Sequence, residues 1–248
     1  MQPISYDLNR ENNLENNQAK PALVNKSNKR SKENSEILNQ CSLDMEVFSI
    51  GDVNRQKVEL FIKKGFFKAY NADISVNSPW VLAIQNGQFK AALGIRSAVE
   101  PLFIEQYLDT PIENVISNVS SNISRGEIAE IGNLYSNAKR FTLPLFLVTA
   151  VSLFCNDYRY MVFSGTEHVL KLIKNIGVES TFIVNADKNK LTPSNDDWGT
   201  YYESQPKVVS ISLASVINFI ESNEIYSAMF TALTPKIIQT TASLQGVI

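Results

Sequence analysis

The first clear pattern along the chain is a helical spacing of apolar residues after Asn54. These residues are Val58, Phe61, Ile62, Phe66 and Ala69. Their spacing is close to 3.6 residues, which places them on one face of a helix. We therefore predict an amphipathic helix here, with ordered structure beginning near Met45.

A β-hairpin is predicted directly after this helix. Two strand-like runs, 80–85 and 88–96, flank the pair Asn86-Gly87. Both residues of a two-residue hairpin turn take positive φ values, and Asn-Gly is well suited to that geometry. The two runs are therefore expected to pair as antiparallel strands. Residues 103–108 predict another strand.

The middle of the chain continues with alternating elements. Residues 110–113 (TPIE) form a capping box, which predicts a helix through about Val119. Residues 127–134 predict a strand in which Gly132 indicates a bulge or a close backbone approach. A buried helix is expected from about Thr142 to Phe154. Its Pro144 is tolerated because it lies in the first turn.

The last third predicts two further strands and two or three helices. Residues 158–164 predict a strand, followed by a helix that Gly165-Thr166 caps and Gly177 ends. Residues 178–184 predict the next strand. Residues 208 to about 234 predict a short strand and one or two helices.

This order of elements predicts an α/β fold. An antiparallel front half joined to a β-α-β-α-β back half requires a mixed central sheet flanked by helices. We expect residues 46–222 to form this domain and residues 223–248 to form a C-terminal helix and tail. Residues 1–45 are rich in Asn, Lys, Glu and Ser, with a single aromatic side chain among the first 40, so we expect a disordered tail there.

Composition narrows the possible functions. The 248 residues are 44% hydrophobic and carry a formal charge of −2, which gives no electrostatic footprint for nucleic acid. The start of the chain lacks the apolar region of a secretory signal, and the longest apolar run, 141–155, is about five residues too short to span a bilayer. We therefore expect a soluble, cytoplasmic protein without a transmembrane segment. Cys155, at the end of that run, is expected to be buried.

Four motifs in order resemble the thermostable hemolysin family. Residues 102–113 (LFIEQYLDTPIE) are similar to its LFLEQYLD-x-P-x-E motif, and residues 128–134 (IAEIGNL) to its IVEVGNLA segment. Residues 163–177 resemble its VFTGT…L…LG pattern. Residues 198–202 (WGTYY), with Pro206 and Val208, resemble its WGSYY…P-x-V tail. The resemblance covers roughly residues 55–215.

This resemblance implies a GNAT-like acyltransferase fold, close in outline to acyl-homoserine-lactone synthases and N-acyl amino acid synthases. It implies transfer of a fatty acyl group from an acyl-CoA or acyl carrier protein thioester to a small amine or amino acid, whose product would be surfactant-like. Two alternatives stay open. The chain is a directly membrane-active hemolysin, or it is a non-catalytic GNAT-like binding protein. The oligomeric state is left open.

Glu130 is the leading candidate for catalysis. It is a carboxylate in an otherwise apolar strand, and burying an unpaired charge is costly, so it must be paired, hydrogen-bonded or functional. As a general base it would accept the proton of the amine. The alternative is a structural carboxylate held by backbone amides or an arginine. Strand alternation places Glu130, Gly132 and Leu134 on one face, unless a bulge at Gly132 resets it.

Glu105 is a second catalytic candidate. In a strand, Glu105 and Tyr107 would share one face and orient a polar amine, unless they are simply polar residues at a sheet edge. Trp198, Tyr201 and Tyr202 are candidates for the wall of an acyl-chain pocket, with plain packing as the alternative.

Five residues are candidate contacts for the thioester donor: Asn133, Lys139, Arg140, Thr142 and Ser164. No glycine lies between Gly132 and Gly165, so the Gly-rich phosphate loop of CoA-dependent enzymes is missing. Lys139 and Arg140 beside a helix start would instead attract a phosphopantetheine on acyl carrier protein, or are solvated loop charges. His168 is the only histidine and has no clustered carboxylates or thiolates, so we predict no metal site.

Overall fold

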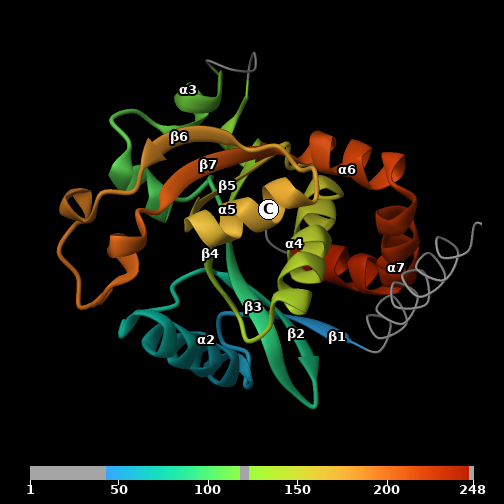
Figure 1. The fold of residues 1–248 in the computed structure, drawn as a ribbon, viewed down its shortest axis with the longest axis horizontal. Helices are drawn as coiled ribbons and strands as arrows, with labels where there is room; N and C mark the ends of the chain where they lie inside the picture. The colour runs from blue at the N-terminus through green and yellow to red at the C-terminus, as the bar shows by residue number, and fades with distance from the viewer. Residues whose placement is uncertain (1–42, 118–122, 246–248) are drawn as a thin grey trace, which may run out of the picture. The chain divides into compact units, whose positions relative to one another are not determined.

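A seven-stranded sheet organises the computed structural model, which describes residues 43–117 and 123–245 (Figure 1). Its strand order is β1-β2-β3-β4-β5-β7-β6. The strands are β1 (Asp44–Ser49), β2 (Trp80–Asn86), β3 (Gln88–Ser97), β4 (Ile128–Ser136), β5 (Tyr160–Gly165), β6 (Thr181–Asn185) and β7 (Lys207–Ser212).

The sheet is mixed, as predicted. Strands β1 to β4 pair antiparallel, β4 and β5 pair parallel, and β7 lies antiparallel to both β5 and β6. The hairpin predicted at Asn86-Gly87 joins β2 to β3, and Gly87 has a φ of 66°. The sequence reasoning missed β1, in which only Met45 and Phe48 are fully buried, so its hydrophobic pattern is weak.

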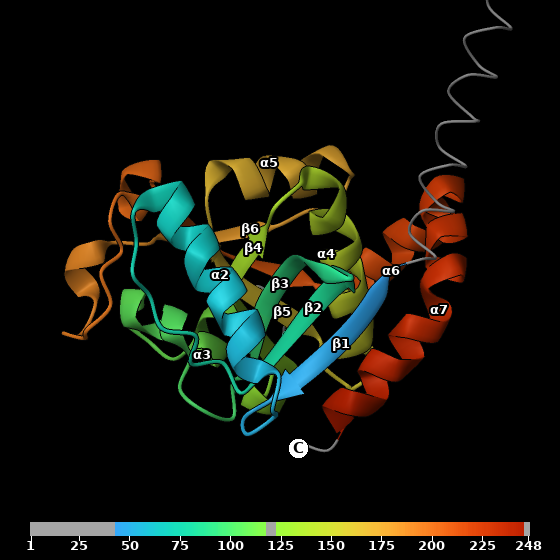
Figure 2. The same ribbon diagram turned by 90° about the horizontal axis from the view of Figure 1, so that it is seen from below.

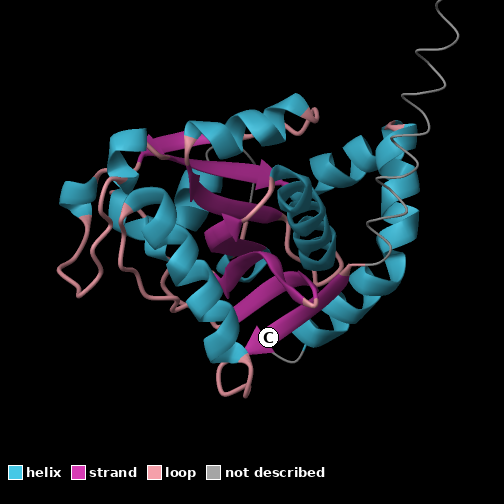
Figure 3. Ribbon diagram, turned by 60° about the horizontal axis from the view of Figure 1, so that its bottom comes forward, coloured by secondary structure: helices cyan, strands magenta, loops and turns pink. Residues whose placement is uncertain are grey.

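Helices cover both faces of the sheet (Figures 2 and 3). One face carries α4 (Lys139–Phe154), α6 (Leu213–Ser222) and α7 (Glu224–Leu244), which pack on one another in the largest hydrophobic cluster. The other face carries α2 (Arg55–Tyr70) over β2 to β4. The same face also carries the 3-10 helix η1 (Phe103–Tyr107) and α3 (Ile112–Ser117), which pack on residues of β4, β5 and β7. Helix α5 (Glu167–Asn175) follows β5.

Several predicted boundaries shift. The predicted tail, 1–45, falls mainly outside the described residues, although β1 already begins at Asp44. The helix predicted through Val119 is described only as far as Ser117, because residues 118–122 lie outside the described part. Strand β6 begins at Thr181 rather than 178, and α7 continues to Leu244, well beyond 234.

Three predictions are wrong. Residues 103–107 form a 3-10 helix instead of a strand, because the amides of this segment bind side-chain carboxylates rather than a neighbouring strand. Pro144 lies in the second turn of α4, since the helix begins at Lys139. Cys155 is exposed, because it follows the last residue of α4 as the chain leaves the core.

Within residues 43–117 and 123–245, none of the helices has both the length and the apolar character that crossing a bilayer requires.

Candidate functional site

Strands β4 and β5 separate after three residue pairs. Their parallel pairing holds only over Ile128, Ala129 and Glu130 of β4, which lie opposite Tyr160, Met161 and Val162 of β5. Beyond these pairs, β4 remains bonded only to β3 and β5 only to β7. A cavity of about 290 Å³ opens at the split, lined by residues of both strands, the C-terminal end of α2, η1 and the loop 191–198.

A bulge in β4 shapes this cavity. Asn133 has a φ of 50°, and the register with β3 passes from Gly132 directly to Tyr135. The bulge turns Leu134 to the opposite face from Glu130, packed against the cluster around α4, which is the reset that the sequence left open. A Cβ built on Gly132 meets no atom within 4 Å, so Gly132 borders empty space inside the cavity.

Glu130 lies at the point where the two strands part. Its side chain is 5% exposed and borders the cavity. Its Oε2 accepts a hydrogen bond from the amide of Phe103 and its Oε1 one from the amide of Ile104, both at 2.9 Å. The carboxylate therefore holds η1 in place, and each oxygen keeps a lone pair for a ligand.

The environment of Glu130 suits proton transfer near neutral pH. Burial raises the pKa of this carboxyl to about 7. The two amide hydrogen bonds and the positive charge of Arg96 favour the charged form and offset only part of the burial. A general base works best when its pKa lies near the operating pH, so the position fits that role on chemical grounds.

Glu105 has a different environment. Its two oxygens accept hydrogen bonds from Arg125 at 2.7 and 2.9 Å, and the amides of Leu102 and Ile112 complete its partners. Burial alone would raise the pKa of Glu105, but Arg125 and these amides bring it down to about 2. Glu105 does not line the cavity, and its contacts are those of a carboxylate that ties η1 to α3 and Arg125.

Replacing Arg125 by Met is therefore expected to cost stability rather than chemistry. It leaves Glu105 and Glu113 without their ion-pair partner, a loss of about 1–3 kcal/mol in the free energy of unfolding at pH 7. Because the folded pKa of Glu105 is depressed, this contribution is complete above an unfolded value of about 4.5 and fades as the pH falls toward 2.

Urea unfolding at pH 7 and at pH 3 measures the effect of Arg125→Met. The matched control is Arg159→Met, which removes a solvent-exposed pair with Glu127 and should have a much smaller effect on stability, because water screens this pair. A penalty for Arg125→Met that is equally large at both pH values would show that Glu105 is not the group that depends on it.

Ser164 of β5 has an unusual hydroxyl. Its Oγ is buried, and it has no hydrogen-bond partner among the described residues. Ser164 lines the cavity on the β5 side of the split, across from the β4 bulge. Since a buried hydroxyl without a partner is costly, this one is well placed to bind a polar atom of a ligand.

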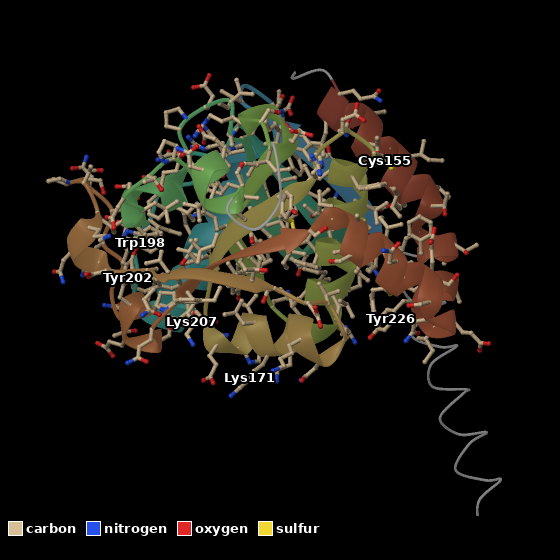
Figure 4. All side chains as sticks on the ribbon, turned by 90° about the horizontal axis from the view of Figure 1, so that it is seen from above. Cys155, Lys171, Trp198, Tyr202, Lys207 and Tyr226 are labelled. Atoms are coloured by element: carbon tan, nitrogen blue, oxygen red, sulfur yellow. The ribbon has the colours of Figure 1, made fainter. Side chains whose placement is uncertain are left out.

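Aromatic side chains close one side of the cavity. Trp198 and Tyr201 line it, with their ring centroids 5.4 Å apart and the rings tilted by 45°, and the ring centroid of Phe103 lies 5.5 Å from that of Trp198. Tyr107 lines it as well, and its hydroxyl lies 2.5 Å from that of Tyr202, which stands behind the wall. Figure 4 shows Trp198 and Tyr202 close together and far from Cys155. Trp198 and Tyr201 are therefore both part of a hydrophobic cluster and part of the cavity lining, whereas Tyr202 does not line the cavity.

Lys139, Arg140 and Thr142 lie outside the cavity lining. They lie within the first four residues of α4, which begins three residues after Ser136, the last residue of β4. Lys139 and Arg140 are exposed, and the guanidinium of Arg140 lies 4.7 Å from the ring centroid of Phe141. Asn133, in contrast, borders the cavity, so the structure splits the predicted donor contacts into two groups.

Residues 49–217, more than half of the chain, match the thermostable hemolysin family. The chain belongs to this family. The match confirms the resemblance that four motifs carried in the sequence. Among curated proteins, no sequence matches this hemolysin-family chain.

Solved structures with similarity to this hemolysin-family protein include acyl-homoserine-lactone synthases. The AHL synthase LasI is 15% identical, with 69% of this chain and 90% of that chain covered and a TM-score of 0.48. FeeM, an N-acyl amino acid synthase from uncultured soil microbes, is 10% identical, with 75% and 98% covered and a TM-score of 0.49. Tetrahymena Gcn5 is 9% identical, with 68% and 96% covered and a TM-score of 0.40. The mixed central sheet with helices on both faces is the architecture predicted from the sequence.

Sequence reasoning missed several residues of the cavity in this hemolysin-family protein. Arg96 borders it from β3, Asp196 from the polar loop, and Gln106 from η1. A signal for Arg96 was present, because it is a charge at the end of the apolar run 91–95. Gln106 carried no such signal, since its position depends on η1 being a helix.

Proposed function

We propose that this protein is an N-acyltransferase, which moves a fatty acyl group from a thioester donor to the amine of a small molecule. The observation that supports it most is the buried carboxylate of Glu130 at the parting of β4 and β5, facing a cavity that runs into the split. A parted pair of strands offers a path for an extended chain, and the cavity size suits a small ligand.

The reaction needs a base, a site for the thioester oxygen and a channel for the donor. The amine nitrogen attacks the thioester carbonyl carbon, a C–N bond forms and the C–S bond breaks. Glu130 takes the proton that the nitrogen loses, directly or through a water molecule, and the leaving thiolate takes up a proton. Glu130 thus acts on an amine that would otherwise stay protonated at neutral pH.

The hydroxyl of Ser164 and the bulge at Asn133 lie on opposite sides of the split, where the carbonyl of the donor would pass. The unpartnered Oγ of Ser164 would donate a hydrogen bond to the thioester oxygen. Gly132 leaves room beside this point for the thioester tail. Tyr107, Trp198 and Tyr201 would wall the site.

The N-terminus of α4 is the proposed place for the phosphate of the donor. Free amides and the helix dipole favour an anion there, and Lys139, Arg140 and Thr142 lie in the first four residues of the helix. Because no glycine allows a close approach of the backbone to a pyrophosphate, we favour the single phosphate of a carrier-bound phosphopantetheine over CoA.

The direct test is an assay of the purified full chain with long-chain acyl-CoA and acyl carrier protein thioesters and a panel of amines. Release of the free thiol and an acylated amine in the mass spectrum are the expected results, with faster turnover of the carrier protein thioester. Binding of a thioester without turnover of any donor would contradict an enzyme and favour a binding protein. The same preparation on liposomes should release no trapped dye unless the acylated product is also present.

A further inference from the structure

Arg96 stands beside Glu130 in the sheet. The two residues are paired in the antiparallel register of β3 and β4, so their side chains project from the same face. Both border the cavity. Residues paired in this way have α-carbons about 4.5–5.5 Å apart, so the two side chains start from neighbouring points of the sheet.

Arg96 forms no salt bridge among the described residues, although its charge acts on the nearby carboxylate of Glu130. Its guanidinium donates to the carbonyl oxygen of Asn77 at 2.8 Å and to that of Pro101 at 3.1 Å. The two carbonyls fix the orientation of the guanidinium and leave other N–H groups to bind a ligand, since arginine has five.

Few charged side chains line the cavity. Among the described residues, Arg96, Glu130 and Asp196 are the charged ones that line it, so Arg96 is its one cation. Asp196 accepts a hydrogen bond from the amide of Ser75 at 2.8 Å, and this contact joins the loop 191–198 to the segment after α2. Arginine binds carboxylates in preference to most other groups, because its planar fork matches their geometry.

We propose that the acceptor is an α-amino acid, whose carboxylate binds Arg96 while its amine faces Glu130. This inference rests on the proposed acyl transfer and names the class of acceptor for the same site. The carboxylate stays unreacted and serves as the anchor, and the adjacent amine forms the new C–N bond. Arg96 is a specificity residue here, since a simple amine without a carboxylate would leave its charge unpaired.

The acceptor itself supplies the first test, which requires no variant. The twenty protein amino acids are screened by calorimetry for binding to the full chain and for acylation by a long-chain carrier protein thioester. The best one is then compared with its primary amide and its decarboxylated amine. We expect the KM of the amide and of the amine to be about 10- to 100-fold higher, since each loses a charge-assisted pair.

Two substitutions locate the effect. Arg96→Gln should raise the KM of the amino acid by about 10- to 100-fold and leave the KM of the thioester and of the decarboxylated amine within about twofold. Arg96→Lys should restore part of the discrimination, because it keeps the charge and loses the planar fork. Circular dichroism checks that both variants fold, and the wild-type comparison stands if one does not.

The outcomes separate this inference from the proposed function. Equal acylation of the amino acid and its decarboxylated amine by the wild type would overturn the inference and leave the acyltransferase standing. A rise in the KM of the thioester alone in Arg96→Gln would also overturn it, since Arg96 would then bind the donor. Calorimetric binding of an amino acid that depends on Arg96, without any acyl transfer, would support the carboxylate anchor and sink the acyltransferase.

Discussion

Glu130→Gln is expected to lower kcat/KM for acyl transfer by about 10²- to 10⁴-fold, the usual loss when a positioned general base is removed. Gln keeps the size of the side chain and one carbonyl oxygen to accept from the amide of Phe103 or Ile104. Its amide nitrogen cannot accept a proton. The variant should therefore bind the thioester with a nearly unchanged affinity and turn it over slowly.

The pH dependence separates a base from a structural carboxylate. The pKa of Glu130 is raised to about 7, and a base acts in its deprotonated form, so activity is lost as the pH falls through this value. Protonation of the amine adds its own slope in both proteins. Below about pH 7, the slope of log kcat/KM against pH should therefore be steeper by one in the wild type than in Glu130→Gln.

The matched control is Glu179→Gln, which makes the same chemical change at an exposed carboxylate outside the cavity. It should keep wild-type kcat/KM and the wild-type pH profile. A folded Glu130→Gln variant with wild-type turnover would show that Glu130 only supports η1. Equal slopes in the wild type and in Glu130→Gln would lead to the same conclusion even if the rate fell.

Glu130 was predictable from the sequence because the argument needs only the cost of burying a charge. Residues 128–131, the buried start of this strand, are apolar except for Glu130, so any fold that buries them has to satisfy this carboxylate. The reasoning left open whether backbone amides or a ligand would do so. In the structure two amides bind Glu130, and the residue also borders the cavity.

The residues around Glu130 were harder to predict, because they depend on contacts that are distant in the sequence. Residues 103–107 contain β-branched and aromatic side chains that also fit a strand, whereas the carboxylates of Glu130 and Glu105 bind the amides at the start of the 3-10 helix. The strand assumption therefore placed Glu105 in the site and hid Gln106. The position of Arg96 beside Glu130 follows from the register of β3 with β4, and no local sequence pattern specifies this register.

The hydrogen bonds from the amides of Phe103 and Ile104 to Glu130 connect the folding of η1 with the proposed chemistry. A carboxylate that binds two amides would have a low pKa if it were also open to water, whereas Glu130 is buried and its pKa is raised. Burial thus makes one side chain suitable both for holding η1 and for taking up a proton. An acceptor that displaces water from the cavity would strengthen the effect, because it lowers the local dielectric further.

Gly132→Leu is expected to block the donor channel without disturbing the fold. A Cβ at this position meets no atom within 4 Å, and the backbone is not in the left-handed region, so a side chain here enters the cavity rather than the core. We expect kcat/KM for long-chain thioesters to fall by about 10- to 100-fold or more, because the added atoms occupy the space for the tail. Gly132→Ala should cause a smaller loss.

The length of the acyl chain makes this test specific. Acetyl and butyryl thioesters reach less far into the split, so the loss in Gly132→Leu should grow with chain length. The control is Gly126→Leu, an exposed glycine that also has open space around its Cβ and does not line the cavity. Thermal unfolding should show both variants within about 1 kcal/mol of the wild type, since each added side chain meets no clash. If Gly132→Leu folds and turns over long-chain thioesters at the wild-type rate, the donor does not pass Gly132, and the proposed path between β4 and β5 is wrong.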